Sequence, residues 1–227
     1  MLDTQRSIAD LVLAHSACAP VFQRHKIDFC CRGHLSLEEA ARARALDVDA
    51  LIQELTQAIA ERSPHSPDPA MLSTAGLVGH LVDTHHAYLR EALPFILQVA
   101  DKVARVHGAH NPKLVPLARD AHAIAEALLP HLDFEEEILF PRLLQEAPDT
   151  VLIARELDAM VAEHRGVGEL LASIREAADD FTLPAWACNS YRALFAELEH
   201  LEADVLTHVH LENHALMPRF VRPEVRS

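Results

Sequence analysis

Apolar residues recur at steps of three and four along nearly the whole chain, which is the spacing of amphipathic helices. The alternation of apolar and polar residues that is typical of strands is absent. Three short segments of turn-forming composition, HGAHNP, EAPDT and DDFTLP, separate the apolar runs. The pattern predicts four long helices, over about residues 71–103, 113–144, 150–178 and 185–219. Because short connections favour antiparallel neighbours, we predict an all-α protein built on an antiparallel four-helix bundle.

A proline-rich segment precedes this predicted bundle. Residues 61–70, ERSPHSPDPA, contain three prolines and two serines, a composition typical of linkers. Before it, Ser7 and Asp47 each precede an apolar run, and Ser36 with Glu39 has the spacing of a helix capping box. These signals predict three or four short helices. We therefore predict a small helical N-terminal domain over residues 1–62, a linker over 63–70 and the bundle over 71–222.

Composition and charge narrow the classes of function. Half of the 227 residues are apolar and 24% are charged, which is typical of a globular protein. The formal net charge of −14 argues against nucleic acid or an anionic membrane as a partner. The chain has no apolar run long enough to span a membrane and no recognisable secretion signal. Its four cysteines lack the spacing of a disulfide framework, which favours a cytoplasmic location.

The predicted bundle contains an internal duplication. The segments HLDFEEEILFPR, from His131, and HVHLENHALMPR, from His208, share His, Glu, Leu, Pro and Arg at the same offsets, 77 residues apart. Another histidine precedes each segment, His86 by 45 residues and His164 by 44. This regularity predicts two matched helical hairpins, each with one upstream histidine and one HxxxE motif.

The duplicated motif has the chemistry of a metal site. Residues four apart share one face of a helix, so His131 with Glu135, and His208 with Glu212, each present an imidazole and a carboxylate to one point. Pseudo-twofold symmetry would bring the two faces together with the two upstream histidines. A buried carboxylate costs several kcal/mol unless it is paired, and two divalent cations bridged by both glutamates would satisfy the whole set. The donors favour iron, with a structural pair of zinc ions as the alternative.

Several neighbours compete for these roles. His85 competes with His86 as the first histidine ligand, and the interval to His164 favours His86. Four other residues are rotated off the ligand face. We predict that Glu136 and Glu137 are surface charges, and that His210 and His214 face solvent or lie behind the ligands.

The adjacent Cys30 and Cys31 allow two interpretations. Neighbouring cysteines do not easily bind one metal, and a disulfide between them would be strained and easily reduced. They are either two small apolar residues in a turn or a pair that passes electrons or metal. In the second case His25 and His34 are close enough in sequence to influence thiolate formation. The other two cysteines are predicted to be structural.

Together, these motifs resemble a known family. The segments IDFCCRGHLSLEEA, THHAYLREALP, HLDFEEEILFPR, AEHRGVGELL and HVHLENHALMPR are similar to those of the iron-sulfur cluster repair di-iron proteins. The resemblance covers nearly the whole chain and implies a Cys-pair domain followed by a hemerythrin-like bundle. It also implies two non-haem irons with an oxo or hydroxo bridge, held by four histidines and two bridging glutamates. One iron would take His86 and His131, and the other His164 and His208.

The resemblance implies a function as well. Such a protein repairs iron-sulfur clusters damaged by nitrosative or oxidative stress, by supplying iron, with Cys30 and Cys31 in redox or iron transfer. Its partners would be damaged iron-sulfur proteins, with nitric oxide or dioxygen as small ligands, and homodimerisation is left open. The alternative is a protein without a repair role that binds or scavenges nitric oxide or dioxygen. An enzyme that reduces nitric oxide at the same centre is a further alternative.

Overall fold

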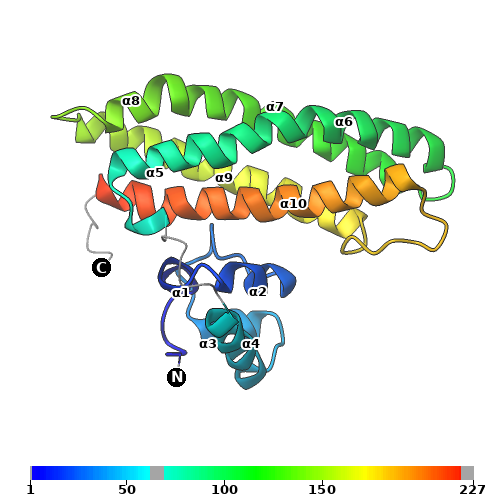
Figure 1. Cartoon of the computed structure of the whole chain (residues 1–227), viewed down its shortest axis with the longest axis horizontal. Coiled ribbons are helices and arrows are strands. Elements are labelled where there is room, and N and C mark those ends of the chain that lie inside the picture. Colours follow the sequence, from blue (N-terminus) through cyan, green and yellow to red (C-terminus); the bar gives the residue numbers. More distant parts are fainter. Residues whose placement is uncertain (1, 62–68, 221–227) are drawn as a thin grey trace. The chain divides into compact units, whose positions relative to one another are not determined.

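The computed structural model describes residues 2–61 and 69–220, and the regular structure in these ranges is helical (Figure 1). One isolated antiparallel bridge, between Ser7 and Ser36, is the sole β-type pairing in the described ranges. The predicted all-α class is therefore confirmed. Residues 63–68 of the predicted linker lie outside the described residues, and Pro69–Met71 forms a short 3₁₀ helix. The domain boundaries predicted from the sequence stay predictions.

The described chain divides into two compact units. One unit contains the described residues of Met1–Leu77 and Leu206–Ser227, and the other contains Val78–Val205. Across the described ranges, none of the helices combines the length and the apolar character that crossing a membrane requires.

Four short helices form the N-terminal part of the first unit: α1 (Ile8–Ala14), α2 (Cys18–Arg24), α3 (Leu37–Ala43) and α4 (Val48–Glu61). Their first turns use the caps that the sequence predicts. The Ser7 hydroxyl accepts a hydrogen bond from the third amide of α1, and Ser36 with Glu39 forms a complete capping box. The Asp47 carboxylate accepts from an amide in the first turn of α4 at 2.9 Å. Helices this short are marginal alone in water, so tertiary packing has to stabilise them.

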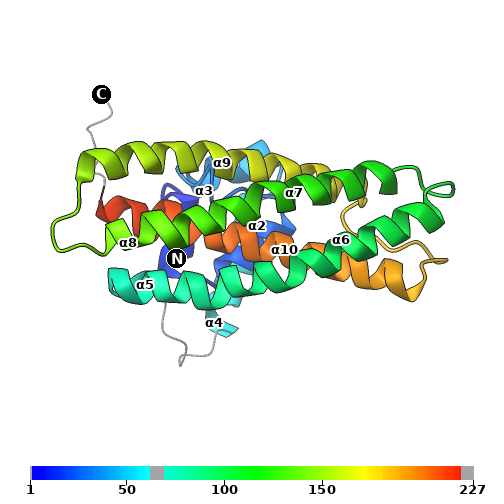
Figure 2. The ribbon, with the colours of Figure 1, turned by 90° about the horizontal axis from the view of Figure 1, so that it is seen from above.

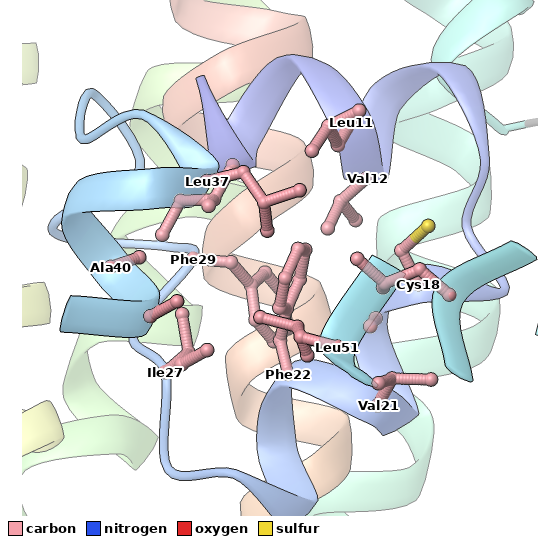
Figure 3. Close-up of a cluster of buried hydrophobic side chains, with 14 residues drawn as sticks. Leu11, Val12, Cys18, Val21, Phe22, Ile27, Phe29, Leu37, Ala40 and Leu51 are labelled. Atoms are coloured by element: carbon pink, nitrogen blue, oxygen red, sulfur yellow. The ribbon is translucent and has the colours of Figure 1, made fainter. Parts of the chain in front are cut away.

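The packing comes from a cluster of apolar side chains enclosed by the four helices (Figure 3). The rings of Phe22 and Phe29 meet within it, with centroids 6.3 Å apart. Cys18 is part of the cluster, and burial raises the pKa of its thiol to about 11, as suits a structural cysteine. Leu206, near the end of the last long helix, packs against the same cluster.

The second unit is a bundle of long helices: α6 (Ala87–His107), α7 (Leu114–Phe134), α9 (Thr150–Ala177) and α10 (Asn189–Leu211) as far as Val205. These helices lie side by side in both views and alternate in direction (Figures 1 and 2). The Asp149 carboxylate caps α9 by accepting from two amides of its first turn. The last helix begins at Asn189, later than the predicted residue 185, because residues 185 and 186 form a turn and residues 187 and 188 have no regular structure.

Three π-helical turns, which the sequence analysis did not predict, interrupt the long helices. The turn η2 (Leu81–His86) joins α5 (Thr74–His80) to α6, and η3 (Glu135–Leu139) joins α7 to α8 (Phe140–Leu143). The turn η4 (Glu212–Leu216) follows α10 and precedes the 3₁₀ helix η5 (Met217–Arg219). The turns η3 and η4 each begin at a duplicated glutamate, and the duplicated prolines, Pro141 and Pro218, follow them. The wider turn accommodates a proline ring, and π turns are frequent at functional sites.

Candidate metal centre

The structure brings the six predicted His and Glu residues together in two groups of four. One group contains His86, Glu135, His208 and Glu212, and the other contains His131, Glu135, His164 and Glu212. In each group the four ligand atoms lie within 4.8 Å of one another, and every one of the residues is buried. Each histidine belongs to one group, whereas both carboxylates belong to both groups.

The two oxygens of Glu135 face different histidines. Its Oε2 lies 3.4 Å from Nε2 of His86, and its Oε1 lies 3.4 Å from Nε2 of His131. The second duplicated pair is closer, since Nε2 of His208 lies 2.9 Å from Oε1 of Glu212. Two ligand atoms that share one cation at about 2.0–2.2 Å lie roughly 2.9–3.5 Å apart, depending on the coordination angle. The observed separations suit ligands arranged around two cations.

The grouping corrects one expectation. The family resemblance implies that His86 and His131 bind the same iron, but the structure assigns His86 to a group with His208 and His131 to a group with His164. The reason is that His86 and His131 approach opposite oxygens of Glu135. The Nε2 atoms of His131 and His164 are 3.2 Å apart, which is consistent with a shared cation.

Carboxylates outside the groups orient two of the histidines. Nδ1 of His86 is 2.9 Å from Oε1 of Glu136, and Nδ1 of His131 is 2.6 Å from Oε2 of Glu163. An Nδ1–H that donates to a carboxylate leaves the Nε2 lone pair directed at the centre. Arg90 in turn donates to Glu136 at 3.0 Å. This arrangement is the usual support of a histidine that binds a metal.

The donor set fits a pair of transition-metal ions. Glu135 and Glu212 are each 0% exposed, and burying two carboxylates costs several kcal/mol per charge unless cations compensate them. Mixed imidazole and carboxylate donors suit iron, and such sites are characteristic of the cores of helix bundles. We find that the residues present match a dinuclear centre in number, burial and spacing.

Replacing Glu136 with glutamine tests the orienting contacts. We expect Glu136→Gln to weaken iron binding roughly 10- to 100-fold, because the neutral amide holds the His86 ring less firmly in its metal-binding orientation. The matched control is Glu137→Gln, one residue further along and exposed, which is expected to bind iron as the wild type does. Iron affinity is measured by competition with a chromogenic chelator. Equal affinities for the two variants would show that Glu136 has no orienting role.

The residue pattern within one helix does not reveal partners that come from other helices. Glu136 was predicted to be surface charge, but it binds His86 from the neighbouring helix. His85 is also buried, yet its Nδ1 pairs with Asp204 at 2.8 Å, and His86 is the one that joins the metal group. Glu163 received no prediction, and only its position before His164 could have suggested it.

His210 and His214 have a role that the sequence did not indicate. Both were expected to face solvent or to lie behind the ligands, but their rings reach the loop that carries the adjacent cysteines. Nδ1 of His210 is 3.3 Å from the carbonyl oxygen of Phe29, and Nε2 of His214 is 2.8 Å from that of Cys30. His210 is only 2% exposed, and burial lowers its pKa to about 4. These two contacts therefore help to hold the cysteine loop in position.

Cys30 and Cys31 lie in this loop, between α2 and α3. They are thiols rather than a disulfide, with sulfur atoms 3.6 Å apart. The contact with Cys31, burial and the nearby Asp28 carboxylate all raise the pKa of the Cys30 thiol well above its ordinary value. His25, which was expected to influence the thiols, instead pairs with Glu54 at 3.0 Å.

Comparison with known proteins agrees with this geometry. Residues 78–220 match the hemerythrin HHE cation-binding domain, and residues 4–59 match ScdA_N, a domain of unknown function (DUF542). The fold and the site thus define a protein with a hemerythrin-like cation-binding domain. The iron-sulfur cluster repair protein YtfE of Yersinia pseudotuberculosis (serotype IB, strain PB1/+) is 34% identical over 220 residues, covering 96% of this chain and 98% of the relative. YtfE of Yersinia pestis (strain Pestoides F) matches with the same identity and coverage. The chain belongs to the family of these iron-sulfur cluster repair proteins, as its motifs predict.

Proposed function

We propose that this protein repairs iron-sulfur clusters damaged by nitrosative or oxidative stress, and that it supplies iron from a centre of two ions. The observation that carries the proposal is that Glu135 and Glu212 each belong to both four-residue groups. Each carboxylate can therefore bridge two ions, with two histidines completing each position. The repair role itself is supported by membership of a family whose relatives are named for it.

The chain's own residues determine how the iron is held. The Glu136 and Glu163 carboxylates keep His86 and His131 as oriented imidazoles, and burial of the site limits the access of water. When bound, the ions would supply the ferrous iron that rebuilding a cluster requires, while any electrons that the cluster needs come from a thiol reductant. Neutral imidazoles hold iron less tightly than thiolates do, so a centre rich in histidine is suited to releasing it.

The proposal also assigns a role to the N-terminal domain. In it, residues 1–62 carry the cysteine pair, 63–70 link the domains and 71–222 hold the iron. Asn213 and His214 directly follow Glu212. The side-chain amide of Asn213 donates to the carbonyl oxygen of Cys30 at 3.2 Å, and Nε2 of His214 lies 2.8 Å from the same oxygen. A movement of the turn η4 when iron is lost would therefore also move the cysteine loop. Thiols coupled in this way can accept iron or pass electrons.

A reconstitution assay tests the proposed repair. A [4Fe–4S] dehydratase is inactivated with nitric oxide, freed of the gas and incubated anaerobically with the iron-loaded protein and a thiol reductant. We expect recovery of dehydratase activity to exceed that with the same amount of ferrous salt in the presence of a chelator. Iron held in a protein site is protected from the chelator until it is transferred.

Variants separate the parts of the proposal. Glu137→Gln, which changes an exposed carboxylate near the centre, should repair as the wild type does, and Glu135→Ala should not repair. Native repair by the double variant Cys30→Ser/Cys31→Ser would refute the role of the thiols alone. A protein that forms a stable nitrosyl adduct but restores no activity would instead be a nitric oxide binder, and the repair function would be wrong.

A further inference from the structure

A second cluster of metal-binding groups lies in the loop between α2 and α3, apart from the His and Glu groups. Asp28, Cys30 and Cys31 each offer one ligand atom, and the three atoms lie within 4.8 Å of one another. The Cys30 sulfur is 3.6 Å from the Cys31 sulfur and 3.3 Å from Oδ1 of Asp28. We propose that these three residues form a mononuclear site for a thiophilic divalent transition-metal ion.

The spacing is that of a tetrahedral site. With metal–sulfur bonds of about 2.3 Å and a metal–oxygen bond of about 2.0–2.2 Å, tetrahedral angles place two sulfurs roughly 3.8 Å apart and sulfur and oxygen roughly 3.6 Å apart. The observed distances of 3.6 and 3.3 Å are close to these values. A cation could therefore enter with small side-chain movements. The proposal thus differs from the expectation that adjacent cysteines do not easily bind one metal.

Hydrogen bonds and close packing within the loop hold the three residues in this arrangement. Oδ1 of Asp28 accepts hydrogen bonds from the amides of Cys30 at 3.2 Å and Cys31 at 2.8 Å. Gly33 packs so closely that a Cβ there would lie 2.6 Å from the carbonyl oxygen of Phe29 and 2.8 Å from Nε2 of His214. A ligand set that is already ordered loses little conformational entropy on binding.

Charge and access define the ion. An entering ion would displace the protons of the two thiols, so that two thiolates and a carboxylate face it, and sulfur donors select zinc, ferrous iron and related ions over magnesium or calcium. Cys30 is buried, whereas Asp28 and Cys31 are half-buried, so an ion can reach the site from solvent. Three protein ligands leave one tetrahedral position for water or an incoming ligand, as in sites that exchange their ligands. The inference deepens the proposed role of the two thiols, and the metal titration tests it without a repair assay, so that the two proposals can fail separately.

Cadmium is the probe, because its thiolate complexes absorb in the ultraviolet and its imidazole and carboxylate complexes do not. Cd²⁺ is titrated anaerobically into the full-length iron-loaded protein, and the difference spectrum is recorded against the same protein without Cd²⁺. We expect a thiolate charge-transfer band that saturates at about one equivalent per chain. A titration of the wild type without this band would overturn the proposal, whatever the variants do.

Variants identify the ligands. Cys31→Ser should reduce the absorbance per bound Cd²⁺ by about half, and Asp28→Asn should weaken binding at least about tenfold while an amide oxygen still accepts the loop hydrogen bonds. Cys188→Ser is the matched control, because Cys188 is an exposed cysteine outside the loop, and it should leave the titration unchanged. A change with Cys188→Ser, or none with Cys31→Ser and Asp28→Asn while circular dichroism is native, would contradict the assignment.

Competition with bound Cd²⁺ distinguishes two candidate native ions. Zn²⁺ and Fe²⁺ are added separately to the Cd²⁺-loaded protein, and loss of the charge-transfer band is followed. Displacement by either ion supports the site, and the ion that displaces Cd²⁺ at the lower free concentration is the one that the site binds more tightly. Failure of both at large excess would show that the thiols bind Cd²⁺ only as a reagent, and the inference of a transition-metal site would fall.

Discussion

Replacing Glu135 with alanine is expected to remove both irons, whereas replacing His164 is expected to remove one. The difference follows from the two groups, because Glu135 belongs to both and His164 to one. In Glu135→Ala, each ion of the proposed centre would keep three of its four protein donors. The two ions would also lose one of the two carboxylate charges that they share, so the repulsion between them would be less well compensated. We expect iron content to fall from about two ions per chain to about none in this variant, and to about one in His164→Ala.

Iron is counted by a chromogenic assay on protein that has been loaded anaerobically and desalted. Glu137→Ala serves as the control, since it removes an exposed carboxylate two residues away and should retain the wild-type content. Helix content by circular dichroism shows whether each variant is folded. If folded Glu135→Ala and His164→Ala proteins lose the same amount of iron, the shared-carboxylate arrangement is wrong.

Local patterns made much of this protein predictable. The spacing of His131 and Glu135 determines that both side chains share a helix face, and the repeat of that spacing 77 residues later identifies the second half of the centre. Helix starts were equally local, as the capping box of Ser36 and Glu39 shows. Within each motif the residues are at most four positions apart, so the local geometry follows directly from the sequence.

Contacts between distant segments could not be predicted in this way. His210 and His214 bind the carbonyls of residues 181 and 184 positions away, and the sequence of their own helix contains no signal of that partner. The contact of Glu136 with His86 joins two different helices for the same reason. The π turns were missed because they keep the helical pattern of apolar residues and change only the hydrogen-bond register.

The pairing of histidines shows how an analogy can be right in composition and wrong in arrangement. The same six residues were expected and are brought together, but the two four-residue groups pair the histidines differently from the expectation. The side from which His86 approaches the Glu135 carboxylate depends on the rotation of two helices about their axes. Rotations of a few tens of degrees are set by packing along the whole interface, and spacing within one helix does not determine them.

Replacing Phe22 with alanine is expected to unfold the short helices α1 to α4 under mild conditions. Phe22 is 0% exposed within the apolar cluster, and a Phe→Ala change in a core costs about 3–5 kcal/mol. About sixty residues supply roughly 3–9 kcal/mol of total stability, so one such loss consumes much of it. Denaturant titration followed by amide hydrogen exchange measures the change in the free energy of unfolding of these helices.

The exposed Phe95 provides the matched control, since it is 45% exposed and Phe95→Ala should change the free energy of unfolding by less than about 1 kcal/mol. A second readout links the cluster to the cysteine loop. The ring of Phe22 contacts that of Phe29, which directly precedes Cys30, and the Cys30 side chain is only 3% exposed. Alkylation of Cys30 should therefore accelerate in Phe22→Ala in proportion to the population of the open form. Unchanged alkylation with a measurable loss of stability would mean that the loop is held by His210 and His214 independently of the cluster.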